Sequence, residues 1–302
     1  MALHTIMAEN SNILPHLISV LLQRGENVRL ISSAKHIYHH IEVIETDLHY
    51  YEDVRIAVQG SLYVYLLSNN TPTDLLTLKA LTYNAINACK ETFAKLIFLD
   101  DKHYSCDDHE ANYHKKMYSY FKNRFKAIED IIVLEIKQQK LNGAIVRCNN
   151  IYGCKPQQIN PFIMKVFKRT WRIGNFLVFI APNKHLSMAY APDVAQVLYS
   201  VAKMRPTENV FFNVPIAQPP ITGNYAADVL KKHHIRQHII VVPTLFNGTL
   251  LNMFSNKFNN SRALGSTDND ILDCRSYFNE AYFTPTGYAQ GLAHVSDYLR
   301  EM

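Results

Sequence analysis

The sequence HTIMAENSNILPHLISVLLQRGENVRLI, residues 4–31, decides the fold. Its first four residues, 4–7, predict a short strand, and residues 27–31 predict a second one. Between them, apolar residues recur every three or four positions from Ile13 to Leu22, which is the period of a helix with one buried face. Gly25 is typical of a residue that ends such a helix. The stretch therefore predicts a strand, a tight turn, a helix and a second strand.

The same alternation continues along the chain. Further strands are predicted at residues 42–45, 61–67, 95–99 and 144–147, and helices at about 51–59, 72–91 and 115–139. In the second half, the predicted helices are 161–172, 192–204 and 224–233, and the predicted strands are 176–180, 210–214 and 238–242. Repeated strand–helix–strand order implies a parallel sheet with right-handed crossovers.

These patterns predict an α/β protein with a Rossmann-like, doubly wound parallel sheet. In such a unit, a nucleotide phosphate commonly sits at the N-terminus of the first helix.

Composition narrows the possible classes of function. The five cysteines form no CxxC pair and the N-terminus has no signal-peptide pattern, so we expect a cytoplasmic protein without a metal site. No apolar run approaches the roughly 18 residues of a membrane span. The formal charge is +5, and the basic segments 114–126 and 165–172 are interpreted as solvated helix faces. We therefore expect neither a membrane nor a nucleic-acid partner.

Several short motifs follow one another in a specific order. Residues 46–48 read Thr-Asp-Leu, residues 147–153 read Arg-Cys-Asn-Asn-Ile-Tyr-Gly, and residues 191–195 read Ala-Pro-Asp-Val-Ala. With Ala127 and Glu129 in the helix before the second motif, nearly the whole chain resembles the NAD(P)-dependent epimerase/dehydratase family, the extended branch of the short-chain dehydrogenases/reductases. The resemblance implies a dinucleotide-binding domain at residues 1–153 and a smaller C-terminal α/β substrate domain at residues 154–302, with some segments of the smaller domain returning to the first sheet. It also implies NADP or NAD as cofactor and a nucleotide or nucleotide sugar as ligand.

The resemblance also assigns cofactor-binding positions, and the sequence departs from the family at several of them. Ala8, Ser11 and Leu14 stand at the three glycines of the family's phosphate-binding turn, and Pro15 lacks an N–H. After the second strand, hydroxyls and Lys35 replace the carboxylate that holds a ribose diol, which would suit the 2′-phosphate of NADP. The cofactor-binding candidates are Ala8, Ser11, Leu14, Ser32, Lys35, Asp47, Ser68 and Lys126, with Asp47 expected near the adenine.

The family's catalytic Tyr-x-x-x-Lys is altered as well. Counting back from Arg147 matches Lys126 to the lysine and places Lys122 at the tyrosine. Tyr118 begins a second Tyr-x-x-x-Lys one helical turn earlier, about 6 Å along the axis. The catalytic candidates are Lys126, Tyr118, Asp100 and Asp101, and the substrate-cleft candidates are Asn150 and Tyr152.

Three functions remain open. The first is a divergent epimerase/dehydratase-like protein that binds NAD(P) or a nucleotide sugar with weak or no standard catalysis. The second is an active, atypical NADP-dependent oxidoreductase or epimerase that uses Tyr118 or the Asp100/Asp101 pair. The third is a non-enzymatic ligand sensor or interaction protein. The family implies a homodimer through the helices predicted at 72–91 and 115–139.

Overall fold

The computed structural model describes most of the 302 residues. The described residues are 1–8, 11–33, 35, 38–67, 75–100, 115–148, 151–153, 163–164, 170–173, 175–180, 183, 185–205, 209–242 and 283–301, with the side chains of 115–125 among those left aside.

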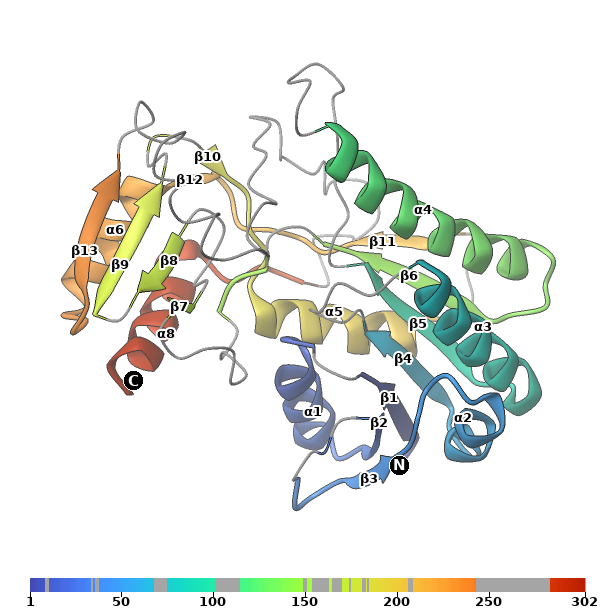
Figure 1. Cartoon of the computed structure of the whole chain (residues 1–302). Coiled ribbons are helices and arrows are strands. Elements are labelled where there is room, and N and C mark those ends of the chain that lie inside the picture. The colour runs from blue at the N-terminus through green and yellow to red at the C-terminus, as the bar shows by residue number, and fades with distance from the viewer. Residues whose placement is uncertain are drawn as a thin grey trace.

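A seven-stranded parallel sheet organises the first part of the protein (Figure 1). Its order is β11-β6-β5-β4-β1-β2-β3, and every neighbouring pair is parallel. The strands are β1 (Leu3–Met7), β2 (Asn27–Ser32), β3 (Glu42–Glu45), β4 (Tyr63–Leu67), β5 (Lys95–Asp100), β6 (Gly143–Arg147) and β11 (Phe211–Asn213). Because β1 lies between β2 and β4, the strand order reverses there. That reversal creates a crevice at the carboxyl ends of the strands, where ligands of open α/β sheets bind.

Helices cover both faces of this sheet (Figure 1). One face packs against α1 (Leu14–Gln23) and α5 (Ala191–Lys203), and the other against α2 (Tyr51–Val58), α3 (Leu75–Thr92) and α4 (Lys115–Lys137). Strand β5 is buried at all six positions, as expected for a central strand between two helical layers. The predicted Rossmann-like doubly wound sheet is therefore confirmed, and β11 shows that the second half of the chain returns to it.

A smaller group of elements follows in the chain. A four-stranded sheet, in the order β13-β9-β8-β7, packs its core against two helices, and a two-stranded sheet pairs β10 with β12. The elements are β7 (Ile163–Met164), β8 (Thr170–Ile173), β9 (Phe176–Ile180), β10 (His185–Leu186), β12 (Ile221–Thr222), α6 (Gly223–Lys232), β13 (His238–Val242) and α8 (Tyr288–Glu301). The division at residue 153 stays a prediction.

The helix predicted at residues 161–172 is wrong where the structure describes this segment. Its two ends form β7 and the start of β8, which pair antiparallel with each other. Strand β8 also pairs with β9, where Trp171 lies opposite Val178. Apolar residues such as Ile163 and Trp171 thus find strand partners, and tertiary pairing overrides the local helical period.

A buried polar cluster lies at the start of β1. His4 is fully buried, and its Nδ1 lies 2.9 Å from the hydroxyl of Tyr65 on β4. Its Nε2 lies 3.8 Å from Glu26, whose carboxylate accepts hydrogen bonds from Lys203 at 2.6 Å and from the main chain of Ala2 at 2.9 Å. Burial lowers the pKa of His4 to about 4, although Glu26 partly opposes this effect. His4 is therefore neutral in the folded protein near neutral pH.

Two further contacts hold α5 in place. The buried ammonium of Lys95 donates hydrogen bonds to the carbonyls of Val201 at 2.6 Å and Met204 at 2.9 Å, which closes the C-terminus of α5. At the other end, Asp193 accepts hydrogen bonds from the main chain of Thr286 at 2.7 Å and from its hydroxyl at 2.8 Å. The C-terminal segment is therefore fastened to the first turn of α5.

Candidate functional site

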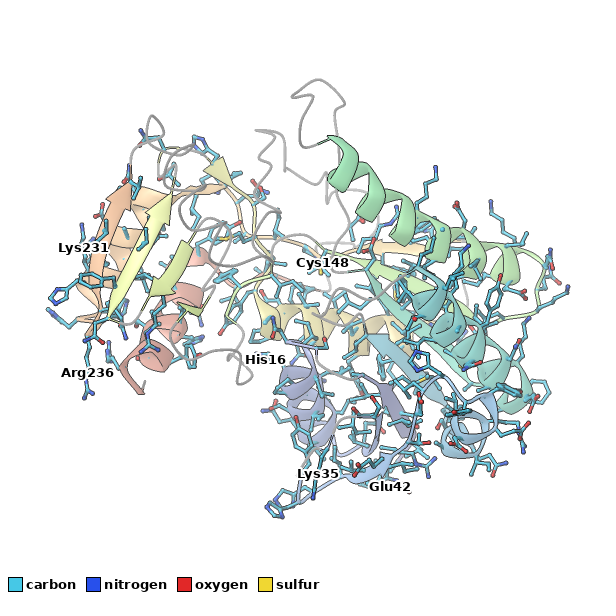
Figure 2. The ribbon with its side chains drawn as sticks, viewed as in Figure 1. His16, Lys35, Glu42, Cys148, Lys231 and Arg236 are labelled. Atoms are coloured by element: carbon cyan, nitrogen blue, oxygen red, sulfur yellow. The ribbon has the colours of Figure 1, made fainter. Side chains whose placement is uncertain are left out.

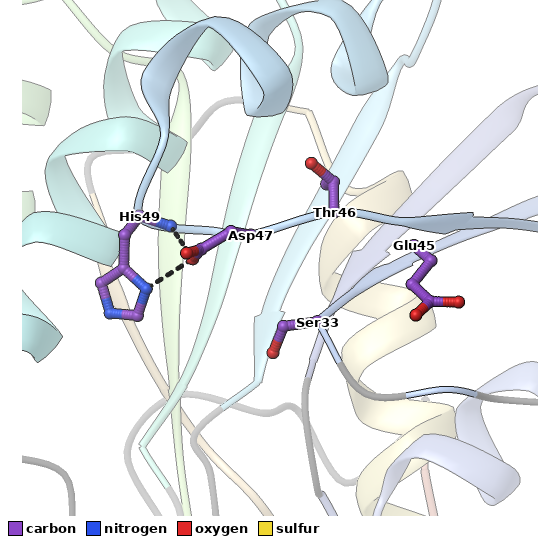
Figure 3. Close-up of a pocket in the computed structure, with 5 residues that line it drawn as sticks. All are labelled: Ser33, Glu45, Thr46, Asp47 and His49. Carbon is purple, nitrogen blue, oxygen red and sulfur yellow. Dashed lines mark hydrogen bonds and ion pairs between the residues drawn. The ribbon is translucent and has the colours of Figure 1, made fainter.

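A cavity of about 380 Å³ lies at the carboxyl ends of β2 and β3 (Figure 3). It is lined by Ser33, Glu45, Thr46, Asp47 and His49. Parallel pairing of the two strands, with Ser32 opposite Glu45, brings these segments together. The main chain of Thr46 then donates to the carbonyl of Ser32 at 3.0 Å and extends the pairing by one residue. The cavity thus occupies one end of the crevice predicted from the strand order.

The cavity is acidic. Asp47 accepts hydrogen bonds on Oδ1 from the main-chain N–H of His49 at 2.9 Å and from its ring Nδ1 at 2.7 Å (Figure 3). The main-chain bond, followed by the ring bond, lowers the pKa of Asp47 and keeps it ionised. Thr46 donates its hydroxyl to Asp53 on α2 at 3.0 Å. Glu45 adds a second carboxylate to the lining, and the lining contains no lysine or arginine within the described part of the chain.

The first turn of α1 follows the carboxyl end of β1. Ala8, Ser11 and Leu14, which stand at the family's three glycine positions, are all buried, and Ala8 and Leu14 belong to the hydrophobic core. The hydroxyl of Ser11 accepts the N–H of Ile13 at 3.4 Å, and its carbonyl accepts the N–H of Leu14 at 3.2 Å. Because Pro15 has no N–H, residues 13–15 present no unused donor to an anion.

Of the catalytic candidates, Asp100 lies at the end of β5, and Lys126 and Tyr118 lie on α4. Asp100, the last residue of β5, is buried and lies opposite Arg147 of β6. Arg147 donates to Glu129 of α4 at 2.6 Å, and its guanidinium lies 3.7 Å from the ring centre of Phe211. This ion pair fixes which side of α4 meets the sheet.

Lys126 lies on α4, three residues before Glu129. It is exposed, whereas Ile128 and Ile132 are fully buried against the sheet. Tyr118 belongs to α4, but its side chain lies outside the described residues. The structure therefore places Asp100 and Arg147 opposite each other, and Lys126 is exposed on α4.

The remaining candidate site residues lie in different parts of the chain. Ser32 is buried at the end of β2, and Lys35 is exposed and does not line the cavity (Figure 2). Ser68, Asp101 and Asn150 lie outside the described residues.

Tyr152 is buried in the core beneath α8. Its main chain bridges to Tyr190, and its hydroxyl has no hydrogen-bond partner among the described residues. Burial raises the pKa of Tyr152 well above its ordinary value. A Cβ added to Gly291 of α8 would lie 2.2 Å from this hydroxyl, so only glycine permits the observed approach. Tyr152 therefore shapes the junction between the two groups of elements.

Sequence reasoning missed Ser33, Glu45 and His49 as cavity residues. His49 follows Asp47 by two positions, and an aspartate that accepts the N–H two residues later is a common turn. That signal could have identified the pair. Glu45 gave no local signal, because only the pairing of β2 with β3 places it in the cavity.

No cluster of three or more potential metal ligands occurs among the described residues. Within the same part of the chain, no helix is long and apolar enough to cross a membrane.

The architecture places the chain in a known class of fold. No protein-family model matches the sequence, and no curated protein matches it. Solved structures do match: the fold is that of the NAD(P)-dependent epimerases and dehydratases, as the sequence resemblance predicted.

Three solved structures illustrate the similarity. The UDP-glucose 4-epimerase of Thermotoga maritima with UDP-glucose has a TM-score of 0.69 at 14% identity, covering 99% of each chain. The UDP-glucose 4-epimerase of Thermus thermophilus in complex with NAD has a TM-score of 0.64 at 14% identity, again covering 99% of each chain. The GDP-L-fucose synthetase of Naegleria fowleri bound to NADP has a TM-score of 0.67 at 8% identity, covering 99% of this chain and 93% of that chain.

Proposed function

We propose that this protein binds a nucleotide or nucleotide sugar at the carboxyl edge of its parallel sheet and has weak or no standard Tyr/Lys hydride-transfer activity. Two findings support ligand binding. The fold is shared with proteins solved with NAD, NADP and UDP-glucose. A cavity also lies at the carboxyl ends of β2 and β3, on the edge where open α/β sheets bind ligands.

The observation that carries the proposal is the first turn of α1. A helix N-terminus binds a phosphate through unused main-chain N–H groups. Here Ser11 accepts the N–H groups of Ile13 and Leu14, and Pro15 has none. A pyrophosphate at this turn would have to displace Ser11 to gain those hydrogen bonds, so dinucleotide binding is expected to be weak.

The arrangement of α4 supports the absence of standard catalysis. Lys126 is exposed. Counting back from Arg147 places Lys122 at the position of the family's catalytic tyrosine. Counting back one and two turns from Glu129, which meets the sheet at Arg147, reaches positions 125 and 121. Both are phenylalanine, which can neither donate nor accept a proton.

Calorimetric titration tests the proposal. We expect measurable binding of NAD or of a nucleotide sugar such as UDP-glucose, with dissociation constants no tighter than the micromolar range and no turnover in assays of epimerisation and of NAD(P)H oxidation. Ser11→Gly, which removes the hydroxyl acceptor, should tighten NAD binding, because the N–H of Ile13 becomes available. The control is Ser19→Gly at an exposed position within α1, which should leave NAD binding unchanged. Silence with every nucleotide, or rapid turnover of one of them, would contradict the proposal.

A second candidate function is catalysis by Asp100, because this carboxyl group is buried at the end of β5 opposite Arg147. Burial of a carboxyl group is a common way to prepare an acid or base. If a substrate is found, Asp100→Asn and Tyr118→Phe should each be assayed over pH, with Asp130→Asn as a control on the exposed side of α4. Loss of turnover in either variant, with the control unaffected, would favour an atypical enzyme.

We also propose a homodimer through α3 and α4. Helix α3 exposes Leu76 at 79% and Tyr83 at 46%, and α4 exposes Leu134 at 55%. Light scattering after gel filtration measures the mass directly. Leu76→Lys should produce a monomer, whereas Leu62→Lys, an exposed leucine before β4, should not change the mass.

A further inference from the structure

Strand β13 forms one edge of the four-stranded sheet, on the side away from the seven-stranded sheet (Figure 1). Its inner side pairs in parallel with β9 along all five residues. The main-chain N–H of His238 donates to the carbonyl of Asn175 at 2.7 Å, so it points toward β9. Because main-chain groups alternate in direction along a strand, the N–H and C=O groups of Ile239 and Val241 point away from β9. No strand in the described part of the chain pairs with them.

The side chains of β13 leave this edge open. Exposed edge strands usually carry a charged residue, a proline or a bulge that prevents further pairing. β13 reads His-Ile-Ile-Val-Val and has no lysine, arginine, carboxylate or proline. Ile240 is 42% exposed and Val241 is 37% exposed, and on β9 Phe176 is 45% exposed opposite His238. A row of β-branched residues with open main-chain groups is suited to pairing with another strand.

The segment that leads into β13 is basic. Residues 231–236 read Lys-Lys-His-His-Ile-Arg. The side chains of Lys231, Lys232 and Arg236 are exposed, and Figure 2 shows Lys231 and Arg236 at the outer side of β13. Asp228 lies 3.7 Å from Lys231, but both side chains are more than half exposed, so this ion pair is weak. The positive charge beside β13 is therefore only partly balanced.

Helix α8 contacts this basic segment without adding net charge to it among the described side chains. Asp297 of α8 is paired with Arg300 of the same helix at 3.1 Å. The guanidinium of Arg300 also donates to the carbonyl of His233 at 2.9 Å. This hydrogen bond fastens the basic segment to α8, so its positive charge has a fixed position at the start of β13.

We propose that the outer edge of β13, together with the basic segment 231–236, binds an acidic segment of another protein that adds to the sheet as an extra strand. In such pairing, main-chain hydrogen bonds supply affinity, and the side chains of the added strand supply specificity. The added strand bonds to the open main-chain groups of Ile239 and Val241, and its carboxylates lie beside the basic segment. Complementary charge then selects the partner. This site is separate from the nucleotide cavity and does not depend on it.

The test uses the full-length protein and two fluorescent peptides. Each carries three glutamates and a run of alternating valine and threonine. The glutamates stand at the amino end of one peptide and at the carboxyl end of the other, so that both strand directions are covered. Fluorescence anisotropy should show saturable binding of one peptide, which weakens as salt is raised. Replacing its glutamates with lysines reverses its charge, and replacing its central valine with proline removes a main-chain donor, so either change should abolish binding.

Two variants of the protein separate charge from strand pairing. Arg236→Glu should weaken peptide binding about tenfold at low ionic strength, as expected from reversing one charge about 6 Å from one carboxylate in water. Its control is Lys140→Glu, an exposed lysine after α4, which should leave binding unchanged. Val241→Pro removes an N–H that points away from β9, so the pairing with β9 is kept and peptide binding should be lost. Urea unfolding verifies that each variant is folded.

Amide hydrogen exchange followed by NMR gives a measurement on the unaltered protein. The amides of Ile239 and Val241 should exchange more slowly when the peptide saturates the protein, because they gain hydrogen-bond partners. The amides of His238 and Ile240 already bond to β9, so their exchange should change little. Peptide binding without this pattern of protection would contradict strand addition.

Other outcomes would also overturn the inference. One is tighter binding of single-stranded DNA, or of vesicles rich in phosphatidylserine, than of either peptide, because the basic segment would then serve a different polyanion. Another is a lower mass of Val241→Pro in light scattering, because a second copy of this chain would then cover the edge. Failure of both peptides to bind would overturn the inference and leave the proposed nucleotide site standing.

Discussion

Acid should destabilise this protein through one buried histidine. Burial lowers the pKa of His4 from 6.5 to about 4, so the folded protein binds fewer protons than the unfolded chain between these values. Stability therefore falls as the pH is lowered through this window. Each pH unit below 6.5 costs about 1.4 kcal/mol, so going from pH 8 to pH 5 costs about 2 kcal/mol from His4 alone. The loss should level off near pH 4.

The measurement is urea unfolding followed by circular dichroism at pH 8 and pH 5. The perturbation is His4→Gln, which does not titrate and keeps a group able to reach the hydroxyl of Tyr65. Its free energy of unfolding should change with pH by about 2 kcal/mol less than that of the wild type. The neighbouring carboxylate of Glu26 contributes little in this range, because its pKa is lowered to about 2 and its own effect begins below its ordinary value of 4.5. Identical pH dependence in both proteins would refute the reasoning.

Three further predictions concern contacts between elements, and urea unfolding tests each. Lys95→Met should cost about 1–3 kcal/mol, because the carbonyls at the C-terminus of α5 lose their buried donor; an unchanged midpoint would contradict this. Gly291→Ala should cost about 1–3 kcal/mol through its clash with the Tyr152 hydroxyl, and adding Tyr152→Phe should recover part of that loss; strictly additive effects would be inconsistent with the clash. Asp193→Ala should cost about 1–3 kcal/mol and make the chain near Thr286 easier to cleave with protease, an effect absent if the two hydrogen bonds do not hold this segment.

The sheet could be predicted from the sequence because its determinants are local. Residues 63–67 and 95–100 are nearly continuous apolar runs, and they form the buried strands β4 and β5. The helix predicted at residues 161–172 was wrong for the opposite reason, because its determinants are not local. Ile163 of β7 pairs with Ile173 of β8, and nothing within either strand alone signals this partner. Strand pairing at a distance is a property of the tertiary fold, and a local period cannot report it.

The positions of the candidate site residues could also be predicted only in part from the sequence. Counting positions from Arg147 selected Lys126, but each residue on a helix turns the side chain by about 100°, so an error of one position changes the face. In the structure, the ion pair between Arg147 and Glu129 shows which face of α4 meets the sheet. Lys126 is exposed. The expectation that Asp47 lies near the adenine stays a prediction. Asp47 does line the cavity, but its pairing with His49 and the presence of Glu45 depend on side-chain geometry that the sequence does not specify.

Different contacts stabilise the two ends of the sheet. Those at the amino end do not involve the positions at which the sequence departs from the family's glycines. Near the amino end, the cluster around His4 and the cap by Lys95 connect β1, β4, β5 and α5. At the carboxyl end, Leu14 is fully buried where a glycine would leave a space, so it adds apolar burial to the same core. Replacing Leu14 with glycine would therefore leave a cavity in this core and lower the free energy of unfolding. In this chain, the residue at the family's third glycine position contributes to stability.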